Sequence, residues 1–358
     1  MKKILLMALC AVMMLALVAC GQNAQEPVQS EEAPASEPAA TEAAEAPATN
    51  DEQPAEDKIV VAGVVLHEDQ QHKLFQKGME DAAIAMGAEF MPGMSETDPE
   101  KEVSLINTYL EKGVDGLAII PINPEASVVN LKRATEEGMK VAILDNPLVD
   151  SSFVSGTVVS DNYELGKATG QEAKKFIEEK MGGKAVIVGL GYKSLMPESS
   201  GPREQGFLDQ VQQLPGVEYV AYQDSWVQDE AIQVAGDLLT AHPETTIIYS
   251  CNEGGTIGAT MAVAQAGKQG QVYVFGIDGS DQIIQMLKDP ADVLQATTAQ
   301  NSYQLGYETM KILIMDIRGE DVSAYKDKVT MLPGVFLPRS NPAELDEFVA
   351  KIKEYTAG

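Results

Sequence analysis

Four apolar runs in this chain each end in a polar side chain that can hydrogen-bond to hydroxyl groups. The runs VAIL, IIYS, VFGI and LQATTA lead into Asp145, into Cys251 and Asn252, into Asp278 and into Gln300. In an open, mostly parallel α/β sheet, ligands bind outside the carboxyl ends of the strands, so polar groups placed there converge on one crevice. Carboxylates accept hydrogen bonds from hydroxyls, whereas side-chain amides both donate and accept them. The pattern therefore predicts a site for a small polar molecule.

The elements that would position these side chains alternate between strand and helix from residue 58 onward. The predicted strands cover residues 59–65, 88–91, 115–120, 140–144, 184–190, 217–222, 246–250, 272–277 and 293–298. Helix start signals lie between them, because Asp98 and Asn123 each precede a proline at the first predicted helical position. Residues 162–180 form a further amphipathic helix. This alternation is typical of βα units and predicts the α/β class with parallel sheets.

Three interruptions of the pattern divide the chain into two lobes. They lie at residues 145–161, 300–302 and 329–334. Three crossings would form a three-stranded hinge, which permits bending and resists sliding, with the ligand cleft between the lobes. The predicted boundaries are 58–160 plus 301–329 for the N-terminal lobe, 161–300 plus 330–340 for the C-terminal lobe, and 341–358 for a C-terminal helical tail.

The first twenty residues predict export. Lys2 and Lys3 precede an apolar run over residues 4–19, which is the pattern of a secretory signal peptide. The run falls short of the roughly 20 residues that a membrane-spanning helix needs. Residues 17–20, LVAC, resemble the lipobox of bacterial lipoproteins, in which the cysteine becomes a lipidated N-terminus. We therefore expect residues 1–20 to be a lipoprotein signal peptide and Cys20 to anchor the protein to the outer face of the cytoplasmic membrane.

The segment after the signal and the rest of the chain are acidic. Residues 21–57 carry ten acidic side chains and no basic one, with repeated Pro and Ala, so they predict a disordered linker. Residues 58–358 keep 44 acidic against 24 basic residues, a net charge of −20. No cluster of Lys and Arg is present to neutralise phosphates, which argues against a nucleic acid partner. Cys251 is the one cysteine after Cys20, so no intrachain disulfide is expected in the folded body.

Several stretches together resemble a known family. They are VAILDNP at 141–147, VSDNYELGKATG at 159–170, GPREQGF at 201–207, TAHPETTIIYSCNEGGTIGA at 240–259, VFGIDGS at 274–280 and LQATTAQNSYQLGYE at 294–308. In order and spacing the chain is similar to the sugar-binding proteins of bacterial ABC transporters, of the ribose-binding and galactose-binding type, from about residue 58 to 329. The resemblance implies two Rossmann-like domains that are joined by three crossovers and close over a sugar.

The resemblance also implies which side chains line the sugar cleft. By register these are Asp145, Arg203, Trp226, Asn252, Asp278 and Gln300. The first loop departs from the ribose-binding pattern and places Asp69, Gln71 and His72 at the corresponding positions, while His67 is expected to face solvent. Asn146 stands where ribose binders have arginine, which argues against ribose itself and favours a hexose, another pentose, a polyol or a ligand with a positive group.

Each of these side chains also has a purely structural interpretation. Asp145 and Asp278 could be helix N-caps, because an aspartate after a strand often is one. Trp226 could pack in a core, although it lies in a polar stretch, and Arg203 could pair with Glu204 on an exposed helix. As cleft residues, the carboxylates would accept from sugar hydroxyls, the arginine would present a planar fork of donors, and the indole would stack on the C–H face of a ring.

The sequence gives little support for metal binding, dinucleotide binding or nucleophilic catalysis. The histidines of HEDQQH are five residues apart, about 140° around a helix, and cannot share one metal-ligating face. Gly189 and Gly191 have no third glycine in register, so dinucleotide binding is unsupported. We therefore expect no cofactor and no metal, and find no motif of a nucleophilic enzyme.

The sequence thus predicts a monomeric, lipid-anchored solute-binding protein, not an enzyme, that captures a monosaccharide or polyol by domain closure and delivers it to ABC permease subunits. Two alternatives stay open. One is a ligand sensor that partners a membrane receptor, and the other is a secreted enzyme acting on a small polar metabolite. A sugar-responsive repressor would need an N-terminal helix-turn-helix, and residues 1–57 contain none.

Overall fold

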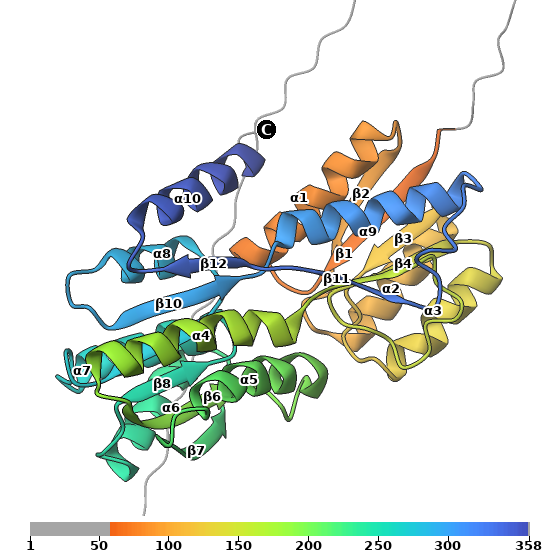
Figure 1. Ribbon diagram of the computed structural model, residues 1–358. Helices are drawn as coiled ribbons and strands as arrows, with labels where there is room; N and C mark the ends of the chain where they lie inside the picture. The colour runs from red at the N-terminus through yellow and green to blue at the C-terminus, as the bar shows by residue number, and fades with distance from the viewer. Residues whose placement is uncertain (1–57, 357–358) are drawn as a thin grey trace, which may run out of the picture. The chain divides into compact units, whose positions relative to one another are not determined.

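The computed structural model of this protein describes residues 58–356 (Figure 1). The signal peptide, Cys20 and the acidic linker predicted from the sequence lie outside the described residues. Within residues 58–356, no helix combines the length and the apolar character that crossing a membrane requires.

The described residues form two six-stranded sheets. The order in the first is β11 (Val329–Leu332), β5 (Thr157–Ser160), β4 (Lys140–Leu144), β3 (Gly116–Ile119), β1 (Val60–Val65) and β2 (Glu89–Met94). The order in the second is β12 (Val335–Pro338), β10 (Leu294–Ala299), β9 (Tyr273–Ile277), β8 (Ile247–Ser250), β6 (Lys184–Gly191) and β7 (Gly216–Asp224). All neighbouring strands are parallel except β12, which runs antiparallel to β10. The predicted α/β class with two open, mostly parallel sheets is confirmed.

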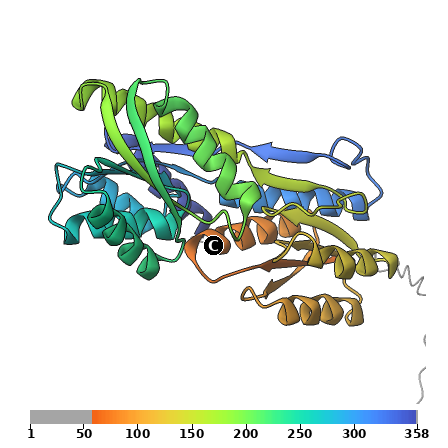
Figure 2. The same ribbon diagram turned by 90° about the horizontal axis from the view of Figure 1, so that it is seen from below.

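Helices cover both faces of each sheet, as the two views show (Figures 1 and 2). On the first sheet, α1 (Gln70–Ala85) and α9 (Ser302–Ile317) share one apolar core, and α2 (Pro99–Glu111) and α3 (Ala126–Glu136) share another. On the second sheet, one core involves α4 (Asn162–Lys180) and α5 (Pro197–Val211), and the other involves α6 (Gln228–Ala241), α7 (Glu253–Gln265) and α8 (Asp281–Lys288). Four separate cores of this kind explain how the fold is stabilised without a disulfide.

The nine predicted strands are present as β1–β4 and β6–β10. Three short strands, β5, β11 and β12, were not predicted, because they lie in or beside segments whose serine, glycine and proline content indicated crossings. Asp98 caps α2 as predicted, its carboxylate accepting from the Glu100 backbone N–H at 2.8 Å. Helix α3 begins at Ala126 and not at Pro124, although the Asn123 side chain still accepts from the Ala126 N–H at 2.8 Å.

The chain passes between the sheets three times. It crosses after β5, returns after β10 to begin α9, and crosses again between β11 and β12. Since β11 pairs with β5, residues 330–332 belong to the first sheet, whereas the sequence places them in the C-terminal lobe. The first sheet with its helices forms the N-terminal lobe, and the second sheet with its helices forms the C-terminal lobe.

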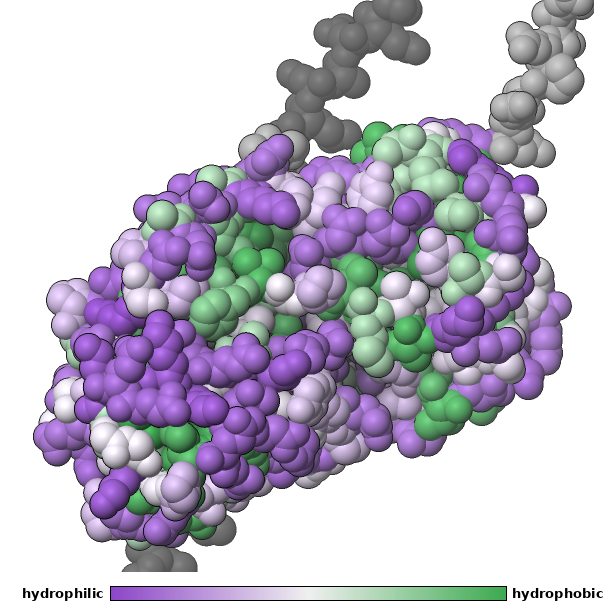
Figure 3. Space-filling model, viewed as in Figure 1, coloured by the Kyte–Doolittle hydropathy of each residue, from purple (hydrophilic) through white to green (hydrophobic). Residues whose placement is uncertain are grey.

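The predicted C-terminal helix is present as α10 (Pro342–Thr356) and packs on the C-terminal lobe. Leu345 is fully buried in the core that also contains α7 and α8, and Phe348 and Val349 pack against that core. In the space-filling view most of the surface is hydrophilic, and hydrophobic residues form small separate patches (Figure 3).

Candidate ligand-binding site

A cavity of about 480 Å³ is lined by residues of both lobes. The structure brings together nine of the ten predicted site residues around it. They are Asp69, Gln71, His72, Asp145, Arg203, Trp226, Asn252, Asp278 and Gln300. Their convergence is a property of the structure, whereas their contact with a ligand stays a prediction.

Asn146 is the predicted site residue that lies elsewhere. Its side-chain amide donates to the Pro121 carbonyl oxygen at 2.8 Å, and the residue is 7% exposed. It borders a neighbouring cavity and does not line the cavity that holds the other nine. The structure therefore places Asn146 outside this cavity, where a buried carbonyl oxygen takes one of its donors, and its contact with a ligand stays a prediction.

Asp145 and Asp278 lie at the carboxyl ends of β4 and β9, as the sequence predicted. Both have left-handed backbone conformations, with φ of 65° at Asp145 and 80° at Asp278. Non-glycine residues rarely adopt positive φ, and such strain is concentrated at functional sites. The backbone therefore turns sharply at both carboxylates and directs the following chain away from the strand.

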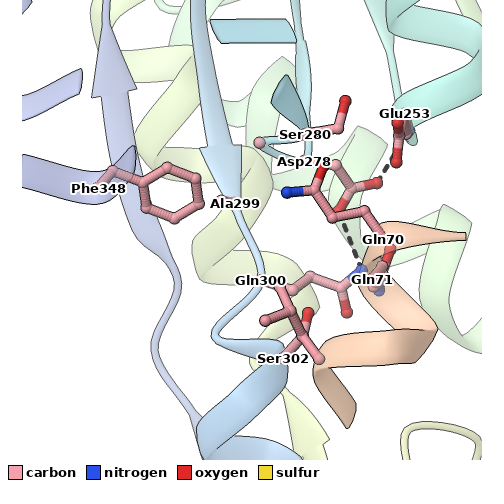
Figure 4. A pocket seen from close by; sticks show the side chains of 11 residues that line it. Gln70, Gln71, Glu253, Asp278, Ser280, Ala299, Gln300, Ser302 and Phe348 are labelled. Atoms are coloured by element: carbon pink, nitrogen blue, oxygen red, sulfur yellow. Dashed lines mark hydrogen bonds between the residues drawn. The ribbon is translucent and has the colours of Figure 1, made fainter. Parts of the chain in front are cut away.

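Asp278 is held by hydrogen bonds to both of its carboxylate oxygens. Oδ2 accepts from the Glu253 backbone N–H at 2.8 Å, and Oδ1 accepts from Gln300 Nε2 at 3.1 Å. Figure 4 shows these side chains beside a small second cavity that shares Gln71 with the first. Burial raises the pKa of Asp278, while the charge of Arg203 and the two hydrogen bonds act in the opposite direction.

Arg203 is the cation at the centre of the site. It is 3% exposed, its Nε donates to Asn162 Oδ1 at 2.8 Å, and its Nη1 donates to the Cys251 carbonyl oxygen at 2.9 Å. Burial also raises the pKa of Asp145, and the Arg203 charge opposes that rise. A fixed guanidinium with N–H groups to spare can bond to ligand oxygens without losing much side-chain entropy.

Asn252 lines the cavity and also caps a helix. It is the N-cap of α7, its Oδ1 accepting from the Gly255 N–H at 3.3 Å, and its Nδ2 donates to the Trp226 carbonyl oxygen at 2.8 Å. Trp226 itself is 36% exposed and lines the cavity, so it does not pack in a core. Asn252 thus fixes the backbone that carries the indole.

The first loop forms the opposite wall. Asp69 is the N-cap of α1, and its Oδ1 accepts from the His72 backbone N–H at 2.9 Å and contacts His72 Nδ1 at 2.8 Å. Burial would raise the pKa of Asp69, but the hydrogen bonds and charge of His72 hold it below its usual value. His67, which the sequence led us to expect to face solvent, lines this cavity, with its ring 5.1 Å from the His72 ring and 6.5 Å from the Trp226 ring.

Several further polar residues of the cavity were not predicted, among them Tyr192 and Glu253. Tyr192 directly follows β6, and burial raises its pKa well above the usual range. Glu253 is the first residue of α7, and burial together with the charges of Asp278 and Asp69 raises its pKa to about 7. Asp145 and Asp278 were located because polar residues at the carboxyl ends of strands line such sites, and the same reasoning would have found both of these residues. Tyr192 directly follows β6, and Glu253 lies shortly after β8, and both strands belong to the second sheet.

Most of the large hydrophobic side chains that are exposed lie at this cavity or its neighbour. The neighbouring cavity, about 700 Å³, shares Leu195 with the first. Of the nine such residues in the described part of the chain, seven line one of these two cavities: Val149, Tyr163, Leu195, Trp226, Val227, Val329 and Met331. Exposed apolar side chains that are gathered in one place mark a site that binds a ligand or another surface.

Most of the folded body matches one family. Residues 62–321 match the family model described as periplasmic binding protein domain, and this chain belongs to that family, as the sequence predicted. It is 27% identical to the D-allose-binding periplasmic protein of Escherichia coli (strain K12) over 248 residues, which are 67% of this chain and 78% of that protein. It is also 27% identical to the ribose import binding protein RbsB of Bacillus subtilis (strain 168) over 236 residues, 64% of this chain and 72% of that protein.

Solved structures share the fold. An ABC transporter solute-binding protein from Agrobacterium vitis, bound with α-D-tagatopyranose, has a TM-score of 0.72 and 21% identity, and the match covers 82% of this chain and 99% of that one. A second one, from Bacillus halodurans with bound myo-inositol, has a TM-score of 0.70 and 18% identity, with coverage of 82% and 98%. At these identities the likeness concerns the fold.

Proposed function

We propose that this protein is the lipid-anchored, extracytoplasmic solute-binding component of an ABC importer, and that it captures a monosaccharide or related polyol by closing its two lobes. One observation carries the proposal. The cavity combines carboxylates at strand ends, a buried arginine and an exposed indole, and both lobes contribute to its walls. These groups complement the hydroxyls and the C–H face of a sugar ring.

The names of the relatives support a sugar as the ligand class. The names of the two similar proteins give D-allose and ribose as their ligands, and the two structural neighbours contain a bound tagatose and a bound inositol. Lobe closure is supported by the three crossings, since a hinge of a few strand-terminal residues allows two rigid bodies to close around a ligand. We propose further that it delivers the ligand to ABC permease subunits and acts as a monomer.

The test is calorimetric titration of the purified protein with D-allose, D-ribose, D-tagatose and myo-inositol, while the fluorescence of Trp226 is recorded. We expect saturable binding of at least one of them with a fluorescence change, because the indole lines the cavity. Asp278→Ala should abolish that binding, and Asp237→Ala, which removes an exposed carboxylate of the same lobe, should not. Unchanged affinity of the Asp278 variant would refute the site.

The lipid anchor has a separate test. Cys20→Ser should release the protein from the membrane fraction of the cells that make it, because the residue that would carry the lipid is lost. Retention in the membrane fraction would contradict the anchor and leave the ligand site unaffected.

A further inference from the structure

A chain of three polar side chains connects the first crossing to the ligand carboxylate. Ser160 is the last residue of β5 in the N-terminal lobe, and its hydroxyl donates to Gln300 Oε1 at 2.8 Å. Gln300 directly follows β10 in the C-terminal lobe, and its Nε2 donates to Asp278 Oδ1 at 3.1 Å. Ser160 and Gln300 are 3% and 8% exposed, so both hydrogen bonds are shielded from water.

The direction of these bonds follows from the chemistry of the three groups. A carboxylate only accepts, so Asp278 requires that the amide of Gln300 present its NH₂ end. The carbonyl end of the same amide then points to Ser160, whose hydroxyl can donate. Without that hydroxyl the carbonyl end would lose its buried donor, and the orientation of the amide would no longer be set from both sides.

Ser160 does not itself line the cavity that holds Asp278; it borders the neighbouring one. It lies at the first crossing between the sheets, and Gln300 lies at the second. The hydrogen bond between Ser160 and Gln300 therefore joins two of the three crossing segments directly.

We propose that Ser160 is a positioning residue for ligand binding, which acts through Gln300 to orient Asp278 and so couples the crossing segments to the ligand carboxylate. This inference rests on the proposed function. Its first consequence is an affinity effect at a residue outside the cavity. Its second is a change in the Gln300 amide that needs no ligand.

The affinity test compares three variants with D-allose, D-ribose, D-tagatose and myo-inositol as probes. Ser160→Ala should weaken binding of whichever probe the unaltered protein binds by about two- to tenfold, the usual worth of one hydrogen bond. Ser160→Thr keeps the hydroxyl and should restore the affinity. Ser155→Ala is the matched control, because Ser155 is equally buried and its hydroxyl bonds to Asp316 at 2.8 Å, away from the site. An equal loss in the Ser155 variant would reduce Ser160 to a structural role.

A double-mutant cycle tests the route. If Ser160 acts through the glutamine, then Gln300→Ala combined with Ser160→Ala should bind as Gln300→Ala alone does. Additive losses would mean that the serine acts by another path and would overturn the proposal.

The ligand-free test uses the side-chain amide of Gln300 in the ¹⁵N NMR spectrum of the protein. Its signals should shift in Ser160→Ala and in Asp278→Ala, and return towards their original positions in Ser160→Thr. If these signals do not shift in Ser160→Ala, the inference is overturned, whatever the ligand is. If those signals shift as expected but the unaltered protein binds none of the four probes, the proposed sugar function fails and the positioning of Asp278 by Ser160 stands.

Discussion

The two walls of the cavity are built differently. The C-terminal wall holds Asp278 and Arg203, which are 6% and 3% exposed and bonded to groups from several elements. The N-terminal wall depends on the first loop, where the Asp69 side chain is 47% exposed and bonds to its neighbour His72 three residues away. Preorganised groups lose less freedom on binding. The C-terminal lobe therefore offers the ready half of the site, and the N-terminal loop completes it.

The largest effect is expected from Arg203→Ala. The buried guanidinium lies near the carboxylates of Asp145 and Asp278, so its loss leaves two buried anions without their cation. Breaking such an arrangement costs about 3–5 kcal/mol, and affinity should fall by more than about a hundredfold. Calorimetry and urea unfolding would measure both.

A control makes the Arg203 result specific. Arg133→Ala removes a half-exposed arginine of α3 that does not line the cavity and that bonds to Glu137 at 2.8 Å and to Asn107 at 2.5 Å, so it should leave ligand affinity unchanged. If Arg203→Ala bound ligand as well as Arg133→Ala does, the C-terminal wall would not be the ready half.

A smaller loss is expected from Asp69→Ala in the N-terminal wall. Its carboxylate is partly hydrated before binding, so removal should weaken affinity by about tenfold. The helix also loses its N-cap, at a cost of about 1 kcal/mol. Asp98→Ala is the matched control, because Asp98 is the N-cap of α2 and does not line the cavity. It should reproduce the loss of stability without the loss of affinity. A loss of affinity as large as for Arg203→Ala would erase the difference between the walls.

Glu253 predicts a pH effect that belongs to the C-terminal wall. Its pKa rises in the folded state from the usual 4.5 to about 7, so the folded protein holds a proton that the unfolded chain has released between these values. By linkage, this residue makes stability fall as pH rises from about 4.5 to about 7, with no further change above. Glu253→Gln should flatten that part of the profile in urea unfolding between pH 5 and 8. An unaltered profile would show that other groups set it.

The smallest change in affinity is expected from Asn146→Ala. The Pro121 carbonyl oxygen loses its donor, so stability should fall by about 1 kcal/mol while affinity stays within about twofold. Calorimetry on the same panel of sugars checks this. A tenfold loss of affinity would show that Asn146 contacts the ligand beside Asp145, which also belongs to the N-terminal lobe.

Much of the fold was predictable because it depends on local pattern. Apolar runs of strand length between helix signals located β1–β4 and β6–β10. The three strands that were missed are short and are completed by partners distant in sequence, as when Val329 of β11 pairs with Thr157 of β5. Four residues of ambiguous composition do not specify a strand until a neighbouring strand supplies the hydrogen bonds.

The same distinction between local sequence and tertiary structure applies to the site. Local sequence was enough to predict that Asp278 and Gln300 would meet, because the carboxyl ends of the parallel strands β9 and β10 share one edge of a sheet. Asp145 follows β4 of the other sheet, so its approach to them depends on how the two lobes face each other. The role of each side chain there depends instead on the tertiary structure. Asn146 turns to the Pro121 carbonyl, and the amide of Gln300 bonds to Ser160, 140 positions away in the chain. Hydrogen bonds across such separations depend on how elements distant in sequence pack together, and packing is a property of the whole chain that no local run of residues encodes.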